Sequence, residues 1–177
     1  MASLRNFMLF QIGWFACILG AAHDHTLLGG VLAAGCLVLH LLTTTGRKEE
    51  ILLMAKGAVI GAVIDSALLH LELIAFKAPG PVVLISPPWM LLLWMLLMTT
   101  INHSMAWLKS RPWLACALGA ISGPFCYFAG ARLGAATIPS PVEFALIMAA
   151  IWAVVMPLLF RLAGSASAAA DEQLQAR

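Results

Sequence analysis

Charged residues are scarce in this chain of 177 residues. Asp, Glu, Lys and Arg make up only 10% of it, whereas they account for about 25% of a typical soluble domain. Hydrophobic residues reach 62%, and the mean hydropathy is +0.96. A water-soluble fold of this size cannot hide so much apolar surface. The composition therefore indicates an integral membrane protein and excludes a soluble enzyme, and the net charge of +2 is too small to indicate nucleic acid as a partner.

Recognisable catalytic motifs are also missing. The sequence has no Walker loop, no GxSxG, no HExxH and no ladder of regularly spaced arginines. Its cysteines (Cys17, Cys36, Cys116 and Cys126) lie in apolar runs and form no CxxC pair. We expect them to be packing residues, with no disulfide, no metal and no cofactor. Any chemistry is then left to polar side chains inside the membrane.

Apolar stretches long enough to cross a bilayer core of about 30 Å as helices dominate what is present. They cover residues 7–22, 26–45, 51–76, 87–108, 112–129 and 141–162. The alternating pattern of a β-barrel is absent. The sequence predicts an all-α membrane protein, a bundle of six transmembrane helices in one domain over residues 1–163. Residues 164–177 are rich in Ala and Ser, and we expect a polar, disordered tail there.

The positions of Lys and Arg predict the orientation. One side of the predicted bundle holds Arg5, Arg47, Lys48, Lys109, Arg111, Arg161 and Arg177, whereas the other holds Lys77 and Arg132. By the positive-inside rule, both termini should be cytoplasmic. A cleaved signal peptide over the first stretch is the alternative. It is less favoured, because the five remaining spans would place the two ends on opposite sides.

The third stretch carries a glycine groove that leads to an acid. Gly57, Gly61 and Asp65 are four residues apart, and at about 100° per residue they share one helix face, to which Glu72 returns. Glycines at this spacing allow close packing of a second helix. An acid at membrane depth needs a reason. Either Asp65 is bonded to donors on a neighbouring helix, or it belongs to a functional site.

A second group of polar residues lies near the end of the fourth stretch. If this segment is helical throughout, Thr99, Asn102 and His103 belong to a polar arc of about 160°. Such a face must meet protein or a water-filled cavity. Gln11 and Trp14 of the first stretch lie at comparable depth, so we expect them to be the partners. The group is either a clamp between helices or a site.

Metal-ligand residue types occur on the outer side, in His23, Asp24 and His25 together with His70 and Glu72. Adjacent side chains point in different directions, and His70 and Glu72 face different sides of their predicted helix. We therefore predict a solvated polar loop there and no metal site.

Three segments together resemble a known family. They are Phe10-Gln11-Ile12-Gly13-Trp14, the run 99–107 with Asn102-His103-Ser104 followed by Trp107, and Gly123-Pro124 through Gly134. They are similar to small bacterial multi-pass inner-membrane proteins grouped as domain of unknown function 2878. The resemblance implies a multi-pass protein of the bacterial inner membrane over nearly the whole chain, but no activity or site residue. Such proteins tend to be encoded near enzymes that modify membrane fatty acids.

Three classes of function remain open. The first is an accessory or scaffold protein that holds a lipid-modifying enzyme at the membrane. The second is a membrane-embedded enzyme that acts on lipid through Asn102 and His103 or through Asp65. The third is a small-solute transporter, which usually needs clear repeats and discontinuous helices. Membrane lipid is the expected partner in the first two.

Overall fold

The computed structural model describes the backbone of residues 2–175 and the side chains of residues 2–164. Within this part the chain forms six α-helices: α1 (Ala2–Ala22), α2 (Thr26–Thr43), α3 (Arg47–His70), α4 (Pro88–Ile101), α5 (Pro112–Arg132) and α6 (Pro141–Gln175). A 3-10 turn, η1 (Ala106–Leu108), follows α4. Five of the helices are long and apolar enough to cross a membrane, and α4 is the shorter exception. The predicted helical class is confirmed.

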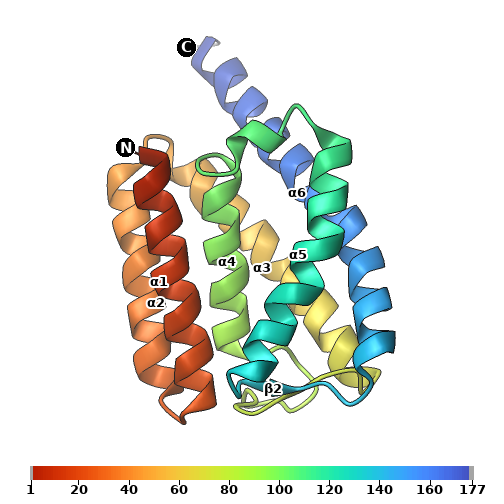
Figure 1. Cartoon of the computed structure of the whole chain (residues 1–177). Helices are drawn as coiled ribbons and strands as arrows, with labels where there is room; N and C mark the ends of the chain where they lie inside the picture. The colour runs from red at the N-terminus through yellow and green to blue at the C-terminus, as the bar shows by residue number, and fades with distance from the viewer. Residues whose placement is uncertain (1, 176–177) are drawn as a thin grey trace.

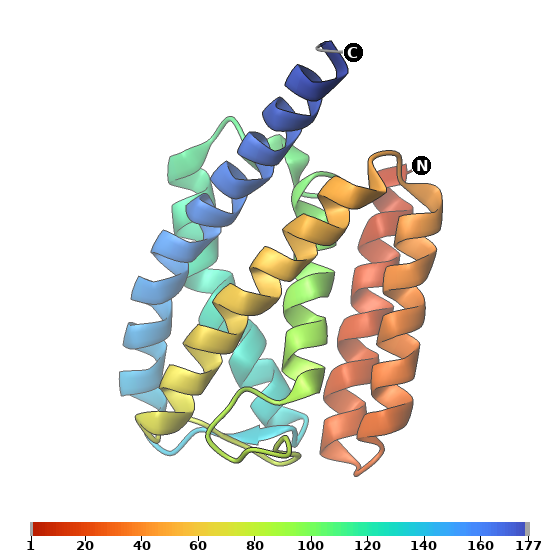
Figure 2. The ribbon, with the colours of Figure 1, turned by 180° about the vertical axis from the view of Figure 1, so that it is seen from behind.

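Helix α4 is the centre of the bundle. The pair α1 and α2 packs on one side of it, α3 crosses it diagonally, and α5 packs against α6 on the other side (Figures 1 and 2). Three helices begin at a proline (Pro88, Pro112 and Pro141), where the missing N–H costs no hydrogen bond.

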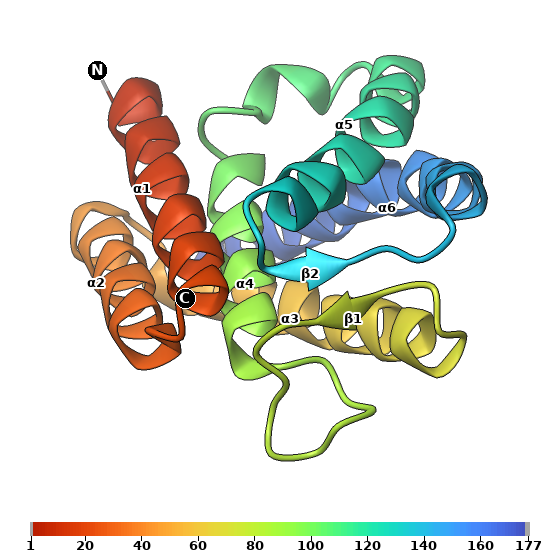
Figure 3. The ribbon, with the colours of Figure 1, turned by 60° about the horizontal axis from the view of Figure 1, so that its bottom comes forward.

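The two ends of the bundle differ in structure. Ala2 and Gln175 lie at one end, called here the terminal end (Figure 1). At the other, the hairpin end, β1 (Ala75–Phe76) pairs antiparallel with β2 (Ala136–Thr137), with Ala75 opposite Thr137 (Figure 3). Lys77 bridges to Asp24 there, with 3.1 Å between Nζ and Oδ2.

The outward faces of the helices are apolar. Leucine and valine side chains of α2 (Leu27, Leu28, Val31 and Leu32) are at least half exposed, as are Val59 and Val63 of α3. In water such a surface would aggregate. In a bilayer it faces acyl chains, so these faces agree with the membrane class that the composition predicts.

The fourth predicted span is not a continuous helix, which corrects the helical arc expected for residues 99–107. Helix α4 ends at Ile101, and residues 102–105 form turns before η1. Thr99 and Thr100 donate their hydroxyls to the carbonyls three residues earlier, at Leu96 and Leu97. Such bonds compete with helix continuation. The turn is tolerated because its backbone groups are bonded inside protein: Met105 N–H donates to Thr100 O, for example.

Helix α3 also ends earlier than the predicted span 51–76. Its last residue is His70, and Glu72 adopts φ +56°, a left-handed conformation that terminates the helix. Glu72 is exposed at the hairpin end. The expectation that Glu72 shares the face of Asp65 is therefore wrong, because the helical phase does not extend to it.

Helix α6 continues to Gln175, into the region 164–177 that the sequence predicts to be a polar tail. Residues 176 and 177 lie outside the described part. A separate tail beyond a domain of residues 1–163 stays a prediction.

Candidate functional site

A polar cluster lies at the terminal end, where four segments meet. Asn6 comes from the start of α1, His40 from the last turn of α2 and Glu50 from the first turn of α3. Asn102 and His103 come from the turn after α4. These residues line a pocket of about 300 Å³ together with Ala2, Arg5 and three threonines, Thr43, Thr44 and Thr45. We call this space the terminal pocket.

Glu50 is the hub of the cluster and is only 5% exposed. Its Oε2 lies 3.3 Å from Nε2 of His40, and its Oε1 lies 3.4 Å from Nε2 of His103. Asn102 donates to Oε1 as well, at 3.0 Å, and Lys109 donates to Asn102 at 2.6 Å. A buried carboxylate is tolerable only with several such partners.

Asn6 ties α1 to the cluster. Its Nδ2 donates to the carbonyl of Thr99 at 3.0 Å, while its Oδ1 accepts from the backbone N–H and the hydroxyl of Ser104. Because a carbonyl can only accept and a backbone N–H can only donate, these bonds fix the orientation of the amide. Its Nδ2 also lies 3.3 Å from Nδ1 of His40. Nδ1 of His40 is therefore the acceptor, and its Nε2 carries a proton toward Glu50.

His103 is held differently. Its ring meets that of His40 edge to face, with 4.9 Å between ring centroids. Nε2 of His103 is buried without a hydrogen bond, although it lies within ion-pair distance of Glu50. The side chain is 27% exposed, so part of the ring is open to the terminal pocket. A histidine oriented by a carboxylate and reachable by solvent can accept or donate a proton.

The structure brings together Asn102, His103 and Thr99 from the predicted intramembrane group, but the α1 residue bonded to this segment is Asn6, which contacts Thr99 and Ser104. The prediction that Asn102 and His103 contact Gln11 or Trp14 is therefore wrong. Because α4 stops at Ile101, the polar residues after it lie nearer the terminal end than a continuous helix would place them. Trp14 lines a different cavity, deeper in the bundle.

Sequence reasoning missed Asn6, His40 and Glu50. An acid in the first turn of a helix normally complements the helix dipole and attracts no notice. His40 stands at the end of an apolar stretch, where a histidine can simply face the headgroups. One feature of the sequence could have indicated this cluster. His40 and Glu50 flank the short loop 44–46 and so lie at a similar depth in the membrane, and His103 lies at the same end of the bundle.

Asp65 forms a second polar centre inside the bundle. It is 0% exposed, and it accepts hydrogen bonds from Trp94 at 3.0 Å, from Ser86 at 3.2 Å and from Tyr127. All three donors come from other segments. Together they connect α3 to α4, to α5 and to the loop before α4. The interpretation of Asp65 as an acid bonded to neighbouring donors matches this arrangement.

Glycines admit the aromatic rings around this centre. A Cβ on Gly61 would lie 2.2 Å from the indole of Trp94, and a Cβ on Gly57 would lie 2.1 Å from Cγ of Met98. On the other side of the bundle, Gly123 admits Trp152 in the same way. The two indoles stack with 5.1 Å between centroids and 11° between planes. The groove predicted from Gly57 and Gly61 thus receives side chains of α4.

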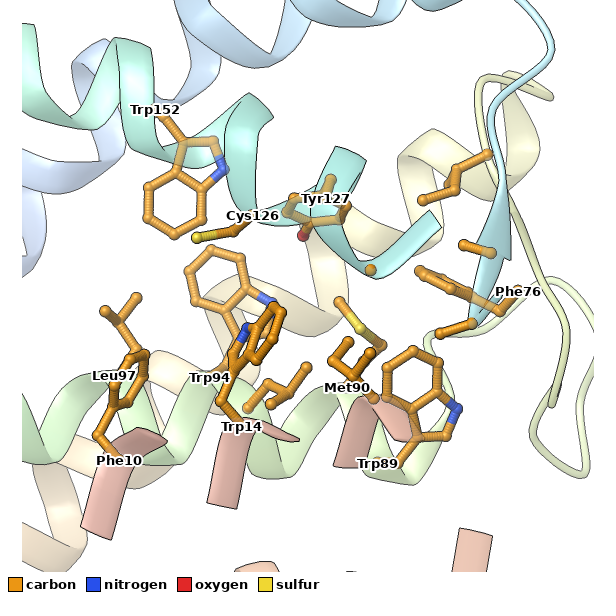
Figure 4. A pocket seen from close by; sticks show the side chains of 16 residues that line it. Phe10, Trp14, Phe76, Trp89, Met90, Trp94, Leu97, Cys126, Tyr127 and Trp152 are labelled. Atoms are coloured by element: carbon orange, nitrogen blue, oxygen red, sulfur yellow. The ribbon is translucent and has the colours of Figure 1, made fainter. Parts of the chain in front are cut away.

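An aromatic cavity of about 90 Å³ lies beside these rings (Figure 4). It is lined by Phe10 and Trp14 of α1, Trp89 and Trp94 of α4, Tyr127 of α5 and Trp152 of α6 among others. Nε1 of Trp152 is buried without an acceptor among the described residues. The lining is almost entirely apolar, so the cavity offers packing and little chemistry.

The polar residues predicted to form an outer loop do not gather into a site in the described structure. Asp24 pairs with Lys77, Nδ1 of His23 bonds to the carbonyl of Leu19, and Nδ1 of His70 bonds to the carbonyl of Ser66.

Fold and site together define a helical, multi-pass type of membrane protein with a polar pocket at one end and a buried acid at its centre. A family model covers residues 3–158, and the chain belongs to that family, described as Protein of unknown function (DUF2878). The match confirms the resemblance found in the sequence. Comparison with curated proteins and with solved structures found no match.

Proposed function

We propose that this protein is a membrane-embedded enzyme that acts on membrane lipid at the terminal pocket. The observation that carries the proposal is the carboxylate of Glu50, buried between the imidazoles of His40 and His103 at the wall of that pocket. A scaffold needs only packing surfaces, whereas a buried acid with two histidines costs free energy that packing alone does not require. Polarised acid–base groups beside an accessible cavity are typical of reactive sites.

The position of the pocket supports a lipid headgroup as the part that enters it. The pocket lies between helix ends, at the terminal end, where a bilayer would present polar headgroups. Arg5 at its edge suits the phosphate of a headgroup. His103 is the candidate general base, and Glu50 is the group that orients it.

The surrounding membrane is proposed to be the bacterial cytoplasmic membrane, with the terminal end in the cytoplasm. Arg5, Arg47, Lys48, Lys109 and Arg111 belong to segments at that end, and the positive-inside rule assigns such an end to the cytoplasm. The enzyme would then act on the inner leaflet.

Lipid analysis of a strain that lacks the gene tests the proposal. The deletion should change the lipid profile, the wild-type gene should restore it, and His103→Gln and Glu50→Gln should not, at equal protein level in the membrane. Glu49→Gln is the matched control, because Glu49 is the half-buried neighbour of Glu50 on the same helix and does not line the terminal pocket. An unchanged profile in the deletion strain contradicts a lipid role.

The accessory role is the alternative outcome. If His103→Gln and Glu50→Gln both restore the lipid profile, the chemistry belongs to another protein, and this chain serves as the membrane partner of a lipid-modifying enzyme.

A further inference from the structure

Two histidines and one glutamate converge in the terminal pocket with the spacing of metal ligands. His40, Glu50 and His103 come from three different segments, and their potential ligand atoms all lie within 4.8 Å of one another. None of the three is a surface residue: His40 and Glu50 are buried, and His103 is partly buried.

Two of the distances match the separation of ligands around one ion. In a tetrahedral zinc site with bonds of about 2.0–2.2 Å, two ligand atoms are separated by roughly 3.3–3.6 Å. The separations here are 3.3 Å between His40 Nε2 and Glu50 Oε2, and 3.4 Å between His103 Nε2 and Glu50 Oε1, each to a different oxygen of the carboxylate. The three ligand atoms together lie within 4.8 Å of one another, so a small rotation of the side chains would close the set around one ion. The buried Nε2 of His103 has no hydrogen bond. Buried polar atoms normally have a partner, so this nitrogen is free to bind a metal ion.

We propose that His40, Glu50 and His103 bind a first-row transition-metal ion, with zinc as the reference ion. Two imidazoles and one carboxylate suit zinc, and are too rich in nitrogen for calcium or magnesium. Three protein ligands leave a coordination position open, as in catalytic zinc sites. The inference rests on the proposed function, because it adds a cofactor to the same pocket, and in it His103 and Glu50 would hold the ion in place of the base and orienting roles given above. It replaces the expectation of no metal drawn from the sequence.

The surrounding hydrogen bonds determine how tightly the ion is held. Asn102 supports the site by donating to Glu50 Oε1. Asn6 opposes it: its Nδ2 faces Nδ1 of His40. An ion on Nε2 displaces the proton there, so neutral His40 must carry its proton on Nδ1, where it meets the N–H of Asn6. Metal-bound histidines normally donate that proton to an acceptor.

Metal content of the purified full-length protein in detergent tests the site. The protein is stripped with a chelator, dialysed against zinc and analysed by mass spectrometry of the metal. Wild type should bind one zinc per chain. His40→Gln, Glu50→Gln and His103→Gln should each weaken binding at least tenfold, whereas the controls His70→Gln and Glu49→Gln should bind like wild type. His70, which is exposed, and Glu49, which is half-buried, are residues of α3 outside the cluster.

Substoichiometric zinc in wild type, or equal zinc in the ligand variants, overturns the site. Size-exclusion chromatography shows which variants fold. If the ligand variants aggregate, the absorption spectrum of wild type loaded with Co²⁺ decides the question. The intense bands of a four-coordinate ion support the site, and the weak spectrum of hydrated Co²⁺ overturns it.

The lipid assay separates this inference from the proposed function. If wild type binds no zinc but His103→Gln and Glu50→Gln still fail to restore the lipid profile, the metal is wrong and the enzyme stands. If zinc binds to the three ligands while the deletion leaves lipids unchanged, the site stands and the function is wrong.

Discussion

Trp94 donates its indole N–H to the carboxylate of Asp65, with 3.0 Å between Nε1 and Oδ2, across a groove left open by Gly61. The glycine and the acid are one helical turn apart on α3, and the tryptophan is on α4. The absence of a side chain at Gly61 is what lets the ring reach the acid. The close packing of α3 and α4 and the hydrogen bonding of the buried Asp65 therefore depend on the same contact.

Gly61→Leu should lower stability markedly, because even its Cβ would lie 2.2 Å from the Trp94 ring. Overpacking of this kind costs about 1–3 kcal/mol or more, and in a chain of this size we expect the melting temperature in detergent to fall by roughly 5–10 °C. Gly35→Leu is the matched control, because nothing lies within 4 Å of a Cβ there. Equal melting temperatures for the two variants would contradict the groove.

Replacement of Asp65 should depend on whether the new side chain can still accept hydrogen bonds. Asp65→Asn keeps one oxygen for Trp94, and the hydroxyls of Ser86 and Tyr127 can rotate, so we expect a loss of about 1 kcal/mol. Asp65→Leu leaves the Trp94 N–H without an acceptor and should cost about 2–4 kcal/mol. Melting curves in detergent compare the two variants.

The same Asp65→Asn variant shows whether Asp65 has only a structural role or takes part in function. A structural Asp65 predicts that the folded variant restores a deletion strain. Normal folding with failure to restore would instead assign proton transfer or substrate contact to Asp65.

The stacked tryptophans should respond unequally to the same substitution. Trp94→Phe and Trp152→Phe remove similar volumes beside a glycine, but Trp94 has a hydrogen bond to Asp65, whereas the N–H of Trp152 is buried without an acceptor among the described residues. Trp94→Phe should be the more destabilising by about 1–2 kcal/mol. Melting temperatures measured side by side test this order, and a larger effect of Trp152→Phe would show that its N–H has a partner.

Fusions to alkaline phosphatase, which is active only outside the cytoplasm, test the orientation. A fusion after Ala78, at the hairpin end, should be active, and a fusion after Ser110, between η1 and α5, should be inactive. The reverse pattern would place the terminal pocket outside the cytoplasm.

The sequence by itself determined the class of the protein and most helix boundaries, because composition and proline positions act locally. The scarcity of charge requires a bilayer, and Pro88, Pro112 and Pro141, each at the head of an apolar run, begin helices. The spacing of Gly57, Gly61 and Asp65 also predicts a close helix contact before any partner is known.

Only the tertiary structure decided where α4 stops and which residues form the terminal pocket. Residues 102–105 form turns, and Asn6, 98 positions away from Ser104, bonds to them. Helical periodicity continued past that point assigns Asn102 and His103 to the wrong partners on α1. His40, Glu50 and His103 meet because three helix ends coincide at one depth, and no spacing along the chain encodes that coincidence, since each residue alone is an ordinary polar group at a helix end.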